Sequence, residues 1–453
     1  MKKNDVFSTV TITGYASSGA GVARIGGQVV FVKNALDGEV CDIRILRVNR
    51  NLAYAKIEQL TLPSPQRIAP SCPSYGPCGG CDLLHMNYTE QLRFKHRRVA
   101  DVLARVGGIS APIMPIIPAE DSHFRYRNKA IFAVGNADDM DFEPIIGFYQ
   151  KRTHRIVTMD DCLLQTETAN RAARVVRRWM AAHKIPAYNE ATQSGIVRHL
   201  FVRQSAATND TVVCIVARTA ALPESNALIT AIRRHCPEVT GIVLCHNNTA
   251  GNVVLDGTFR TLWGEQYLQD CLCGLTFQLA PRSFFQVNPI QTEKLYAQVK
   301  RYAALNGRET VLDFYCGTGT IALCLADSAA TVIGVEVVPE AVRDAIENAR
   351  KNGITNARFI TSDVAAAAAS LQKEGITPDV VIVDPARRGL DSAVIDAIAA
   401  MHPKRIIYVS CNPATLARDL NLFAEQGYKT SEVTPLDMFP QCAHVECVSL
   451  LER

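Results

Sequence analysis

The sequence predicts a multidomain α/β protein with a small β-barrel first, an α+β domain next and a parallel α/β domain last. Three observations lead to this prediction. A chain of 453 residues is too long for a single hydrophobic core. The first sixty residues alternate short apolar strands with glycine turns, and from about residue 275 onward strands alternate with helices. We expect domains over residues 1–60, 61–270 and 271–453.

The N-terminal segment has the pattern of a small antiparallel barrel. Its apolar stretches, residues 10–16, 21–36 and 39–60, contain no helical period longer than two turns. A proline-rich linker follows over residues 62–73. Residues 13–40 resemble a TRAM domain, an OB-like RNA-binding barrel found on RNA-modifying enzymes. A barrel that serves only as a scaffold remains the alternative.

The middle segment begins with an amphipathic helix over residues 88–108, which Gly107 and Gly108 end. Its apolar face is formed by Leu92, Val99, Val102, Leu103 and Val106. Strand patterns then alternate with two helices between residues 124 and 270, which predicts an α+β domain.

Composition points to a soluble cytoplasmic protein that binds a polyanion. There is no run of about 18 apolar residues, and the first ten residues lack the apolar stretch of a signal peptide. Basic residues outnumber acidic ones before residue 275, whereas acidic residues are in slight excess after it. This asymmetry fits a polyanion-binding face joined to a catalytic domain. A solvated surface with a slight bias explains the charge alone equally well.

Three closely spaced cysteines predict a metal site. Cys72, Cys78 and Cys81 stand in a loop of Gly and Pro, CPSYGPCGGC, and Cys162 is the best candidate for a fourth ligand. Clustered cysteines in a reducing compartment indicate metal binding or catalysis. Three close ligands with one distant ligand are more typical of iron–sulfur ligation than of zinc. We therefore expect a 4Fe-4S cluster with a role in structure or RNA docking.

The C-terminal domain opens with a glycine turn, VLDFYCGTGTIALCLA, over residues 311–326. Gly317 and Gly319 let the backbone approach a ligand, and Thr320 is expected to cap the following helix. The third glycine of a dinucleotide fingerprint is absent. Three acids follow at the ends of later strands: Glu336, Asp363 and Asp384. Glu336 is suited to bind the ribose hydroxyls, and Asp363 is suited to contact the adenine side or to cap a helix. This order fits a class I (Rossmann-like) methyltransferase better than a dehydrogenase.

The segment RIIYVSCNPA, residues 405–414, places Cys411 between a buried strand and a helix that Asn412 and Pro413 start. The helix dipole there favours a thiolate. Three motifs resemble the RNA 5-methyluridine methyltransferase family: DPARRG (384–389), IIYVSCNPAT (406–415) and LDMFPQCAHVE (436–446). The family's phenylalanine-rich strand is matched by RSFFQVN with Gln286. The family has Ser or Thr where this chain has Cys442.

The resemblance implies methylation of uracil C5 in RNA with S-adenosylmethionine as the methyl donor. Cys411 would add to C6, and Glu446 would remove the C5 proton after methylation. The cofactor would be held by Gln286, Tyr315, Gly317, Thr320, Glu336, Asp363 and Asp384. Arg387 or Arg388 suits a phosphate contact. His444 is expected to pack, with orientation of the base as the alternative.

The target uridine must be flipped or unpaired, since stacking shields C6. The FRYRNK segment offers Arg125, Arg127 and Lys129 as RNA contacts, or as ordinary surface residues. Because family members with a TRAM domain and a cluster mostly modify 23S ribosomal RNA, we expect that substrate. Alternatives are the transfer-RNA T-loop, cytosine C5 methylation and a non-catalytic RNA-binding protein. No protein partner and no membrane association are implied.

Overall fold

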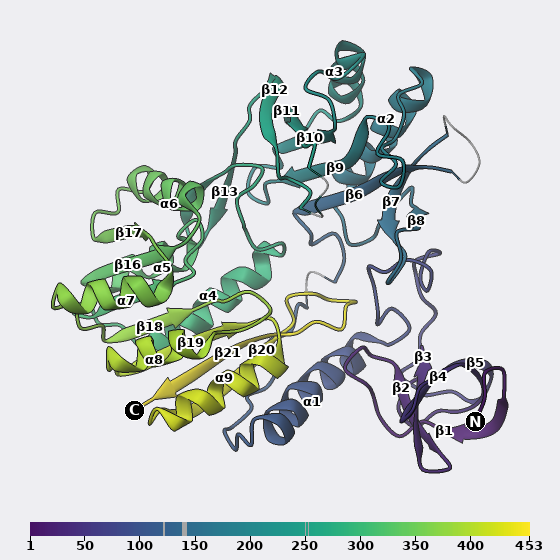
Figure 1. Ribbon diagram of the computed structural model, residues 1–453, viewed down its shortest axis with the longest axis horizontal. Coiled ribbons are helices and arrows are strands. Elements are labelled where there is room, and N and C mark those ends of the chain that lie inside the picture. The colour runs from purple at the N-terminus through teal and green to yellow at the C-terminus, as the bar shows by residue number, and fades with distance from the viewer. Residues whose placement is uncertain (121–122, 138–142, 250, 252) are drawn as a thin grey trace.

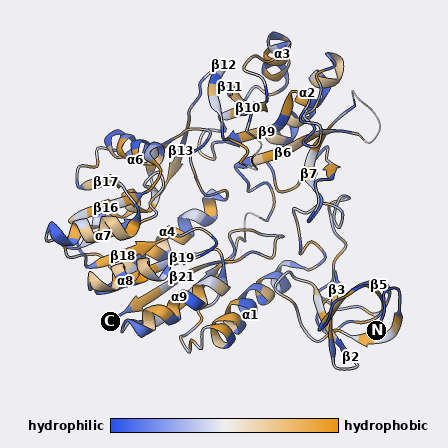
Figure 2. Ribbon diagram, viewed as in Figure 1, coloured by the Kyte–Doolittle hydropathy of each residue, from blue (hydrophilic) through white to orange (hydrophobic). Residues whose placement is uncertain are grey.

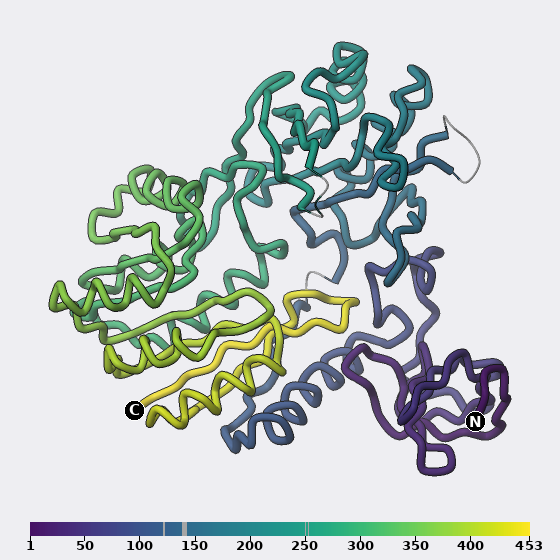
Figure 3. Tube along the Cα trace, viewed as in Figure 1, coloured from purple at the N-terminus to yellow at the C-terminus, as the bar shows by residue number. Residues whose placement is uncertain are grey.

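The computed structural model describes residues 1–120, 123–137, 143–249, 251 and 253–453. In this part of the chain a small N-terminal β unit, a middle sheet and a C-terminal sheet follow one another (Figure 1). The two termini lie in different units, the N-terminus in the small β unit and the C-terminus at the end of a strand of the C-terminal sheet (Figure 3).

The N-terminal unit is a curled sheet with the strand order β1-β4-β5-β3-β2. Its strands are β1 (Val6–Thr11), β2 (Gly21–Ile25), β3 (Gln28–Lys33), β4 (Val40–Val48) and β5 (Leu52–Leu62). Alternate side chains such as Val30, Ile43 and Ala53 are fully buried in its core, as expected of a pleated strand with one face inward. The prediction of purely antiparallel pairing was wrong at one place, because β3 and β5 are parallel neighbours.

The middle sheet has the order β12-β11-β10-β9-β6-β7-β8 in the described residues, with helices α2 and α3 packed against it. Its elements are β6 (Lys129–Asn136), β7 (Pro144–Tyr149), β8 (Ile156–Thr158), α2 (Glu167–Ala182), β9 (Val197–Gln204), β10 (Thr211–Ala217), α3 (Ser225–His235), β11 (Val239–His246) and β12 (Thr258–Gly264). The α+β pattern of two helices among strands is the one that the sequence predicts.

Helix α1 (Tyr88–Val106) is amphipathic as predicted, but it packs on the C-terminal domain. Its buried Val99 and Leu103 belong to the core that lies under α9 (Pro413–Glu425). Hydrophobic and hydrophilic stretches alternate along the α1 ribbon (Figure 2). Val106, which the pattern assigns to the apolar face, is 62% exposed because the helix ends there at Gly107. Residues 61–270 therefore do not pack as one unit.

The C-terminal sheet has the order β17-β16-β15-β18-β19-β21-β20. Its elements, after the hairpin β13 (Leu268–Leu272) and β14 (Leu275–Leu279), are α4 (Pro289–Ala303), β15 (Thr310–Phe314), α5 (Thr320–Leu325), β16 (Thr331–Glu336), α6 (Pro339–Lys351), β17 (Ala357–Thr361), α7 (Val364–Lys373), β18 (Val380–Val383), α8 (Ser392–Ala400), β19 (Arg405–Ser410), α9, β20 (Lys429–Leu436) and β21 (Glu446–Glu452).

The expectation of strict β-α-β order from residue 275 was wrong at both ends of this domain. Strand β21 is antiparallel to both β19 and β20, because a loop without a helix joins β20 to β21 and cannot cross over to a parallel position. The β13–β14 hairpin is antiparallel as well, and it packs into the C-terminal core. No helix in the described residues has the length and apolarity that crossing a membrane requires.

Candidate active site

The candidate site lies at the carboxyl ends of the parallel strands. Strand β15 is flanked by β16 on one side and by β18 on the other, so the chain leaves β15 in one direction and returns on the opposite side. Ligands of open α/β sheets bind in the crevice that forms at such a switch point. The glycine turn, the strand-end acids and Cys411 all follow strands that end at this edge.

The turn after β15 is compact because three of its residues have left-handed backbone angles. The φ values are +66° at Tyr315, +55° at Gly317 and +79° at Gly319. A Cβ at Gly319 would lie 3.0 Å from the Phe359 ring, so this position requires glycine for space as well as for conformation. The predicted cap was wrong by one residue: Gly319 is the N-cap of α5, and the Thr320 hydroxyl instead lies 2.7 Å from that of Tyr296.

Glu336, at the end of β16, is fixed by backbone donors. The amide N–H of Gly317 donates to Oε2 over 3.1 Å and that of Val338 donates to Oε1 over 3.0 Å. The carboxylate therefore sits at the glycine turn with acceptor capacity to spare. Asp363 caps α7, because its Oδ1 accepts the amide of Ala366 over 3.0 Å.

A buried carboxyl that the motif analysis missed, Asp313, supports the glycine turn from below. It is 1% exposed, and its Oδ2 accepts the Ala322 amide in α5 over 3.0 Å. Burial, with the charge of Asp384 second, raises the pKa of Asp313 to about 8. An acid within the apolar strand VLDF is the signal that would have revealed it. Burial likewise raises the pKa of Asp384 to about 7.

Cys411 is half-buried and follows β19 directly, and Asn412 caps α9 as expected. Burial raises the pKa of its thiol to about 11; Glu446 and Asp384 add to the shift, and the Arg387 cation opposes it. The expectation that the helix dipole favours a thiolate was wrong for the free protein. Burial and two neighbouring acids outweigh the partial charge of one helix end.

Glu446 is the first residue of β21 and is 3% exposed. Burial and the neighbouring Asp384 raise its pKa well above the usual value, although Arg387 opposes the shift. The Arg387 guanidinium lies 3.3 Å from Nε2 of His444, and burial lowers the pKa of that imidazole to about 4. Since arginine only donates, Nε2 of the neutral ring accepts.

The loop that carries Arg387 is tied to the helix that follows Cys411. The Arg387 carbonyl accepts Nδ2 of Asn412 over 3.1 Å and the Thr415 hydroxyl over 3.3 Å. These contacts hold DPARRG and SCNPAT together, and they place a permanent cation beside the thiol.

The four predicted ligand cysteines line a single cavity of about 300 Å³. Burial raises the pKa of Cys78, Cys81 and Cys162. Within the described ranges, however, no three His, Cys, Asp or Glu side chains are arranged as the ligands of a metal ion. Arg127 and Lys129 line the same cavity, so two cationic side chains face the thiols.

Cys442 lies beside this cavity and packs with Cys81, Cys162 and Tyr126. Its thiol donates to the carbonyl oxygen of Gly80 over 3.1 Å. The hydrogen bond that a Ser or Thr hydroxyl is able to make at this position is therefore made here by a thiol.

The remaining predicted residues are placed as follows. Gln286 is largely buried, and its backbone carbonyl oxygen accepts a hydrogen bond from Nδ2 of Asn128 over 3.0 Å. Arg125 pairs with both carboxylate oxygens of Asp161 at 2.7 Å and donates to the carbonyl of Cys162, so its guanidinium orders the Cys162 loop. Lys129 lies 5.7 Å from the centroid of the exposed Phe284 ring.

Comparisons with known proteins agree with this geometry. Residues 264–453 match the tRNA (uracil-5-)-methyltransferase family, and residues 8–57 match the TRAM domain. An uncharacterised RNA methyltransferase of Bacillus cereus is 42% identical over the whole of this chain and 98% of its own length. The chain belongs to the RNA uracil-5-methyltransferase family. It is thus an S-adenosylmethionine-dependent RNA methyltransferase with an N-terminal TRAM domain.

Two further relatives of this RNA methyltransferase are informative. An uncharacterised RNA methyltransferase of Clostridium acetobutylicum is 41% identical over the whole chain and 98% of its own length. The crystal structure of the Pyrococcus abyssi tRNA (uracil-54, C5)-methyltransferase in complex with S-adenosyl-L-homocysteine is 26% identical, with a TM-score of 0.77 over 98% of this chain and 99% of that one.

Proposed function

We propose that this RNA methyltransferase forms 5-methyluridine through a covalent adduct between Cys411 and C6 of the target uridine. The observation that carries the proposal is the grouping of a half-buried thiol, a buried carboxyl and a permanent cation at one sheet edge. Glu446 and Arg387 are the strongest electrostatic neighbours of the Cys411 thiol. A nucleophile and a base within one buried site are what addition and elimination at C6 require.

Cys411 activates a carbon that is otherwise a weak nucleophile. When sulfur adds to C6, electron density moves to C5 and O4. C5 then attacks the methyl group of S-adenosylmethionine, whose methyl–sulfur bond breaks to release S-adenosylhomocysteine. The raised pKa of Cys411 means that the free protein holds this thiol protonated, so the thiol must give up its proton before sulfur adds to C6; the adjacent Arg387 offsets the negative charge that develops.

Glu446 completes the cycle. After methyl transfer C5 carries both a hydrogen and a methyl group, and the base takes the proton while the C6–S bond breaks. Burial raises the pKa of Glu446, which makes the carboxylate a stronger base than an exposed glutamate.

The methyl donor is proposed to lie in the crevice beside the glycine turn. Gly317, Thr320 and Tyr315 form the turn, and Glu336 offers its carboxylate to the ribose hydroxyls. Asp363, Asp384 and Gln286 are proposed to border the remainder of this site.

The cysteine cavity is proposed to hold a 4Fe-4S cluster through Cys72, Cys78, Cys81 and Cys162. Two observations support this assignment: four thiols line one cavity, and the cationic side chains of Arg127 and Lys129 line it as well, which suits an anionic thiolate-ligated cluster. When bound, the cluster would cross-link the loop at residues 72–81 to the Cys162 turn. Anaerobically purified protein should contain about four irons per chain and absorb near roughly 400 nm. Stoichiometric zinc without iron would contradict this assignment.

We propose 23S ribosomal RNA as the substrate, because the TRAM domain and the four clustered cysteines, Cys72, Cys78, Cys81 and Cys162, occur together in this chain. Arg127 and Lys129 are proposed to contact its backbone. Transfer RNA is the second candidate, since the similar Pyrococcus abyssi enzyme acts at uracil 54 of tRNA.

One experiment separates the two substrates. RNA from a strain that lacks this gene is digested separately for ribosomal and transfer RNA, and 5-methyluridine is counted by mass spectrometry. Loss of 5-methyluridine from 23S rRNA alone supports the proposal, and loss from tRNA supports the second candidate. Loss of 5-methylcytosine instead would identify a cytosine methyltransferase. A strain with unchanged RNA, complemented or not, would indicate a non-catalytic RNA-binding role.

A further inference from the structure

Glu446 depends on a loop for its position. The chain reverses between β20 and β21 over residues 437–445, and the last residue of β20, Leu436, is paired with Glu446. In the described part of the chain no hydrogen bond to the Glu446 carboxylate is recorded. The orientation of this side chain therefore follows from the backbone path that leads into β21.

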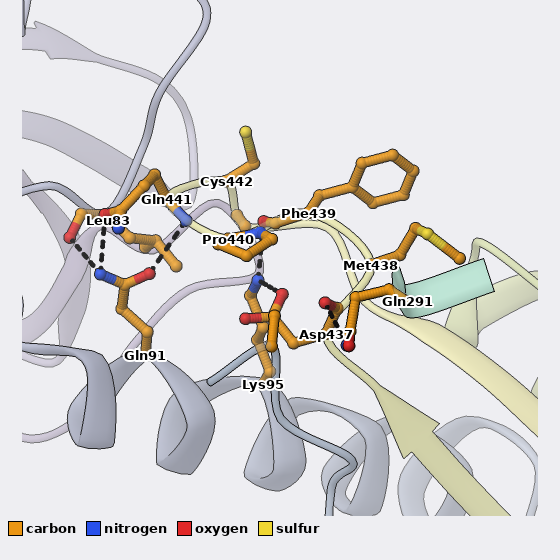
Figure 4. A network of polar contacts seen from close by, with 12 residues as sticks. Leu83, Gln91, Lys95, Gln291, Asp437, Met438, Phe439, Pro440, Gln441 and Cys442 are labelled. Atoms are coloured by element: carbon orange, nitrogen blue, oxygen red, sulfur yellow. Dashed lines mark hydrogen bonds and ion pairs between the residues drawn. The ribbon is translucent and has the colours of Figure 1, made fainter. Parts of the chain in front are cut away.

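Within the first seven residues of this loop, 437–443, side chains of α1 bind Asp437, Phe439 and Gln441 (Figure 4), and Arg98 of α1 donates to the carbonyl of Ala443. Lys95, which has no exposed surface, donates to Oδ1 of Asp437 over 2.5 Å and to the carbonyl of Phe439 over 2.9 Å. Gln91 pairs with Gln441: its Nε2 donates to the Gln441 side chain over 2.9 Å, and its Oε1 accepts the Gln441 amide over 3.0 Å. Both residues are thus bound to backbone atoms of the loop.

Other elements bind the same loop. Backbone groups of Asp437, Met438, Pro440 and Ala443 are hydrogen-bonded by Gln291, Asn288, Tyr126 and Asp82. The loop has no regular secondary structure, so side chains replace the backbone partners that a strand or helix supplies.

Stability alone is a poor explanation for the buried Lys95–Asp437 pair. Both side chains are fully buried, and removing two charges from water costs energy that an apolar pair of similar volume avoids. An apolar pair lacks direction, whereas the Lys95 ammonium group binds both Asp437 Oδ1 and the Phe439 carbonyl, and the Tyr88 hydroxyl donates to Asp437 Oδ2 over 3.0 Å. The pair therefore specifies one path for the loop.

We propose that Lys95 is a positioning residue for proton removal by Glu446, with Gln91 as its partner on α1. This inference rests on the proposed function. In the step concerned, the Glu446 carboxylate takes the proton from C5, the C5–H electrons form the C5=C6 double bond, and the C6–S bond breaks to release the Cys411 thiolate. Sulfur addition and methyl transfer come earlier and use Cys411 and the cofactor crevice.

The test is a Lys95→Met variant assayed with uridine RNA and S-adenosylmethionine. Misplacement of a base by about 1 Å lowers the rate on the order of 100-fold, so elimination should become the slowest step. We expect kcat to fall, the KM for S-adenosylmethionine to stay within about twofold, and a methylated protein–RNA adduct to accumulate on denaturing gels. Wild-type protein should show little adduct under the same conditions.

Two further variants separate positioning from folding. The single variant Lys95→Met leaves the Asp437 carboxylate buried without a cation, which lowers Tm. Adding Asp437→Asn removes this charge as well, so that loss of Tm disappears. Leu103→Ala leaves a cavity in the same helix, away from the 437–443 loop, and lowers Tm without touching it. We expect the double variant to regain Tm but still accumulate adduct, and Leu103→Ala to lose Tm without accumulating it.

The outcomes are distinct. Full kcat in the double variant, or no adduct in any Lys95 variant that still binds S-adenosylmethionine, would overturn the positioning role. RNA that contains 5-fluorouridine blocks elimination chemically and should trap the wild-type protein and the Lys95 variants equally. If wild-type protein fails to trap this RNA, the proposed function itself is wrong, and the fault does not lie with Lys95.

Discussion

Asp384→Asn should stabilise the protein at neutral and alkaline pH while lowering its activity. Burial raises the pKa of the Asp384 carboxyl from 3.8 to about 7. The folded chain therefore holds a proton that the unfolded chain releases between these two pH values. Stability from this residue is fully present below about pH 4 and falls as pH rises toward 7. Asparagine is isosteric and cannot ionise, so it removes this loss.

The magnitude follows from the size of the shift. A pKa raised from 3.8 to about 7 corresponds to about 4 kcal/mol, since a tenfold change in an ionisation constant corresponds to about 1.4 kcal/mol. This value is an upper bound, because the side chain is partly exposed and water screens its charge. The gain should be close to zero near pH 4, reach about 1.5 kcal/mol at pH 5 and level off above pH 7.

Scanning calorimetry of wild-type and Asp384→Asn protein at pH 5, 6, 7 and 8 provides the assay. A gain of this size in a domain of roughly 180 residues raises Tm by up to about 10 °C. Asp391→Asn is the matched control, because Asp391 is exposed and caps α8 without a side-chain hydrogen bond. A Tm difference that does not change with pH, or a loss of stability at pH 8, would refute the account of Asp384 as a buried, destabilised carboxylate.

Three further predictions follow from the site. The pKa values of Cys411 and Glu446 are both raised, and both groups act without their protons. We therefore expect kcat/KM to rise continuously from pH 6 to pH 9. A plateau already at pH 6 would show that burial does not raise the pKa of the thiol. Gly319→Ala should weaken S-adenosylmethionine binding at least about tenfold in calorimetric titration, because its Cβ would meet the Phe359 ring and its φ is left-handed. The control Gly375→Ala, which has open space and a comparable φ of +77°, should leave binding unchanged. Cys442→Ser should keep kcat within about twofold because a hydroxyl is able to donate to the Gly80 carbonyl as the thiol does, and a large loss would show that the thiol has another role.

Much of the catalytic domain could be predicted from the sequence because its chemistry is local. The glycine turn, Glu336 at the end of β16 and Cys411 between β19 and α9 each lie within a few residues of a strand end. Hydrophobic runs locate the strands, and the carboxyl ends of parallel strands share one edge. The positions of these residues on one sheet edge follow from those two facts.

What the sequence did not predict depends on long-range packing. Helix α1 lies far from α9 in the chain, so its packing on the C-terminal core, and the Lys95–Asp437 pair that results, have no local signal. The protonation state of Cys411 was also mispredicted, since burial and the charges of Glu446 and Asp384 depend on segments far apart in the sequence. Asp313 stands out in the sequence as an acid within an apolar strand, but its hydrogen bond to the Ala322 amide depends on how α5 packs over β15.

The central claim is the covalent path through Cys411 and Glu446. Its most direct test is to incubate a Glu446→Gln variant with uridine RNA and S-adenosylmethionine, digest the product with protease and nuclease, and identify the linked peptide by mass spectrometry. The account predicts a peptide that contains Cys411 and carries a methylated uridine nucleotide, and no such species with Cys411→Ser. An adduct on another cysteine, or release of 5-methyluridine at the wild-type rate by Glu446→Gln, would contradict it.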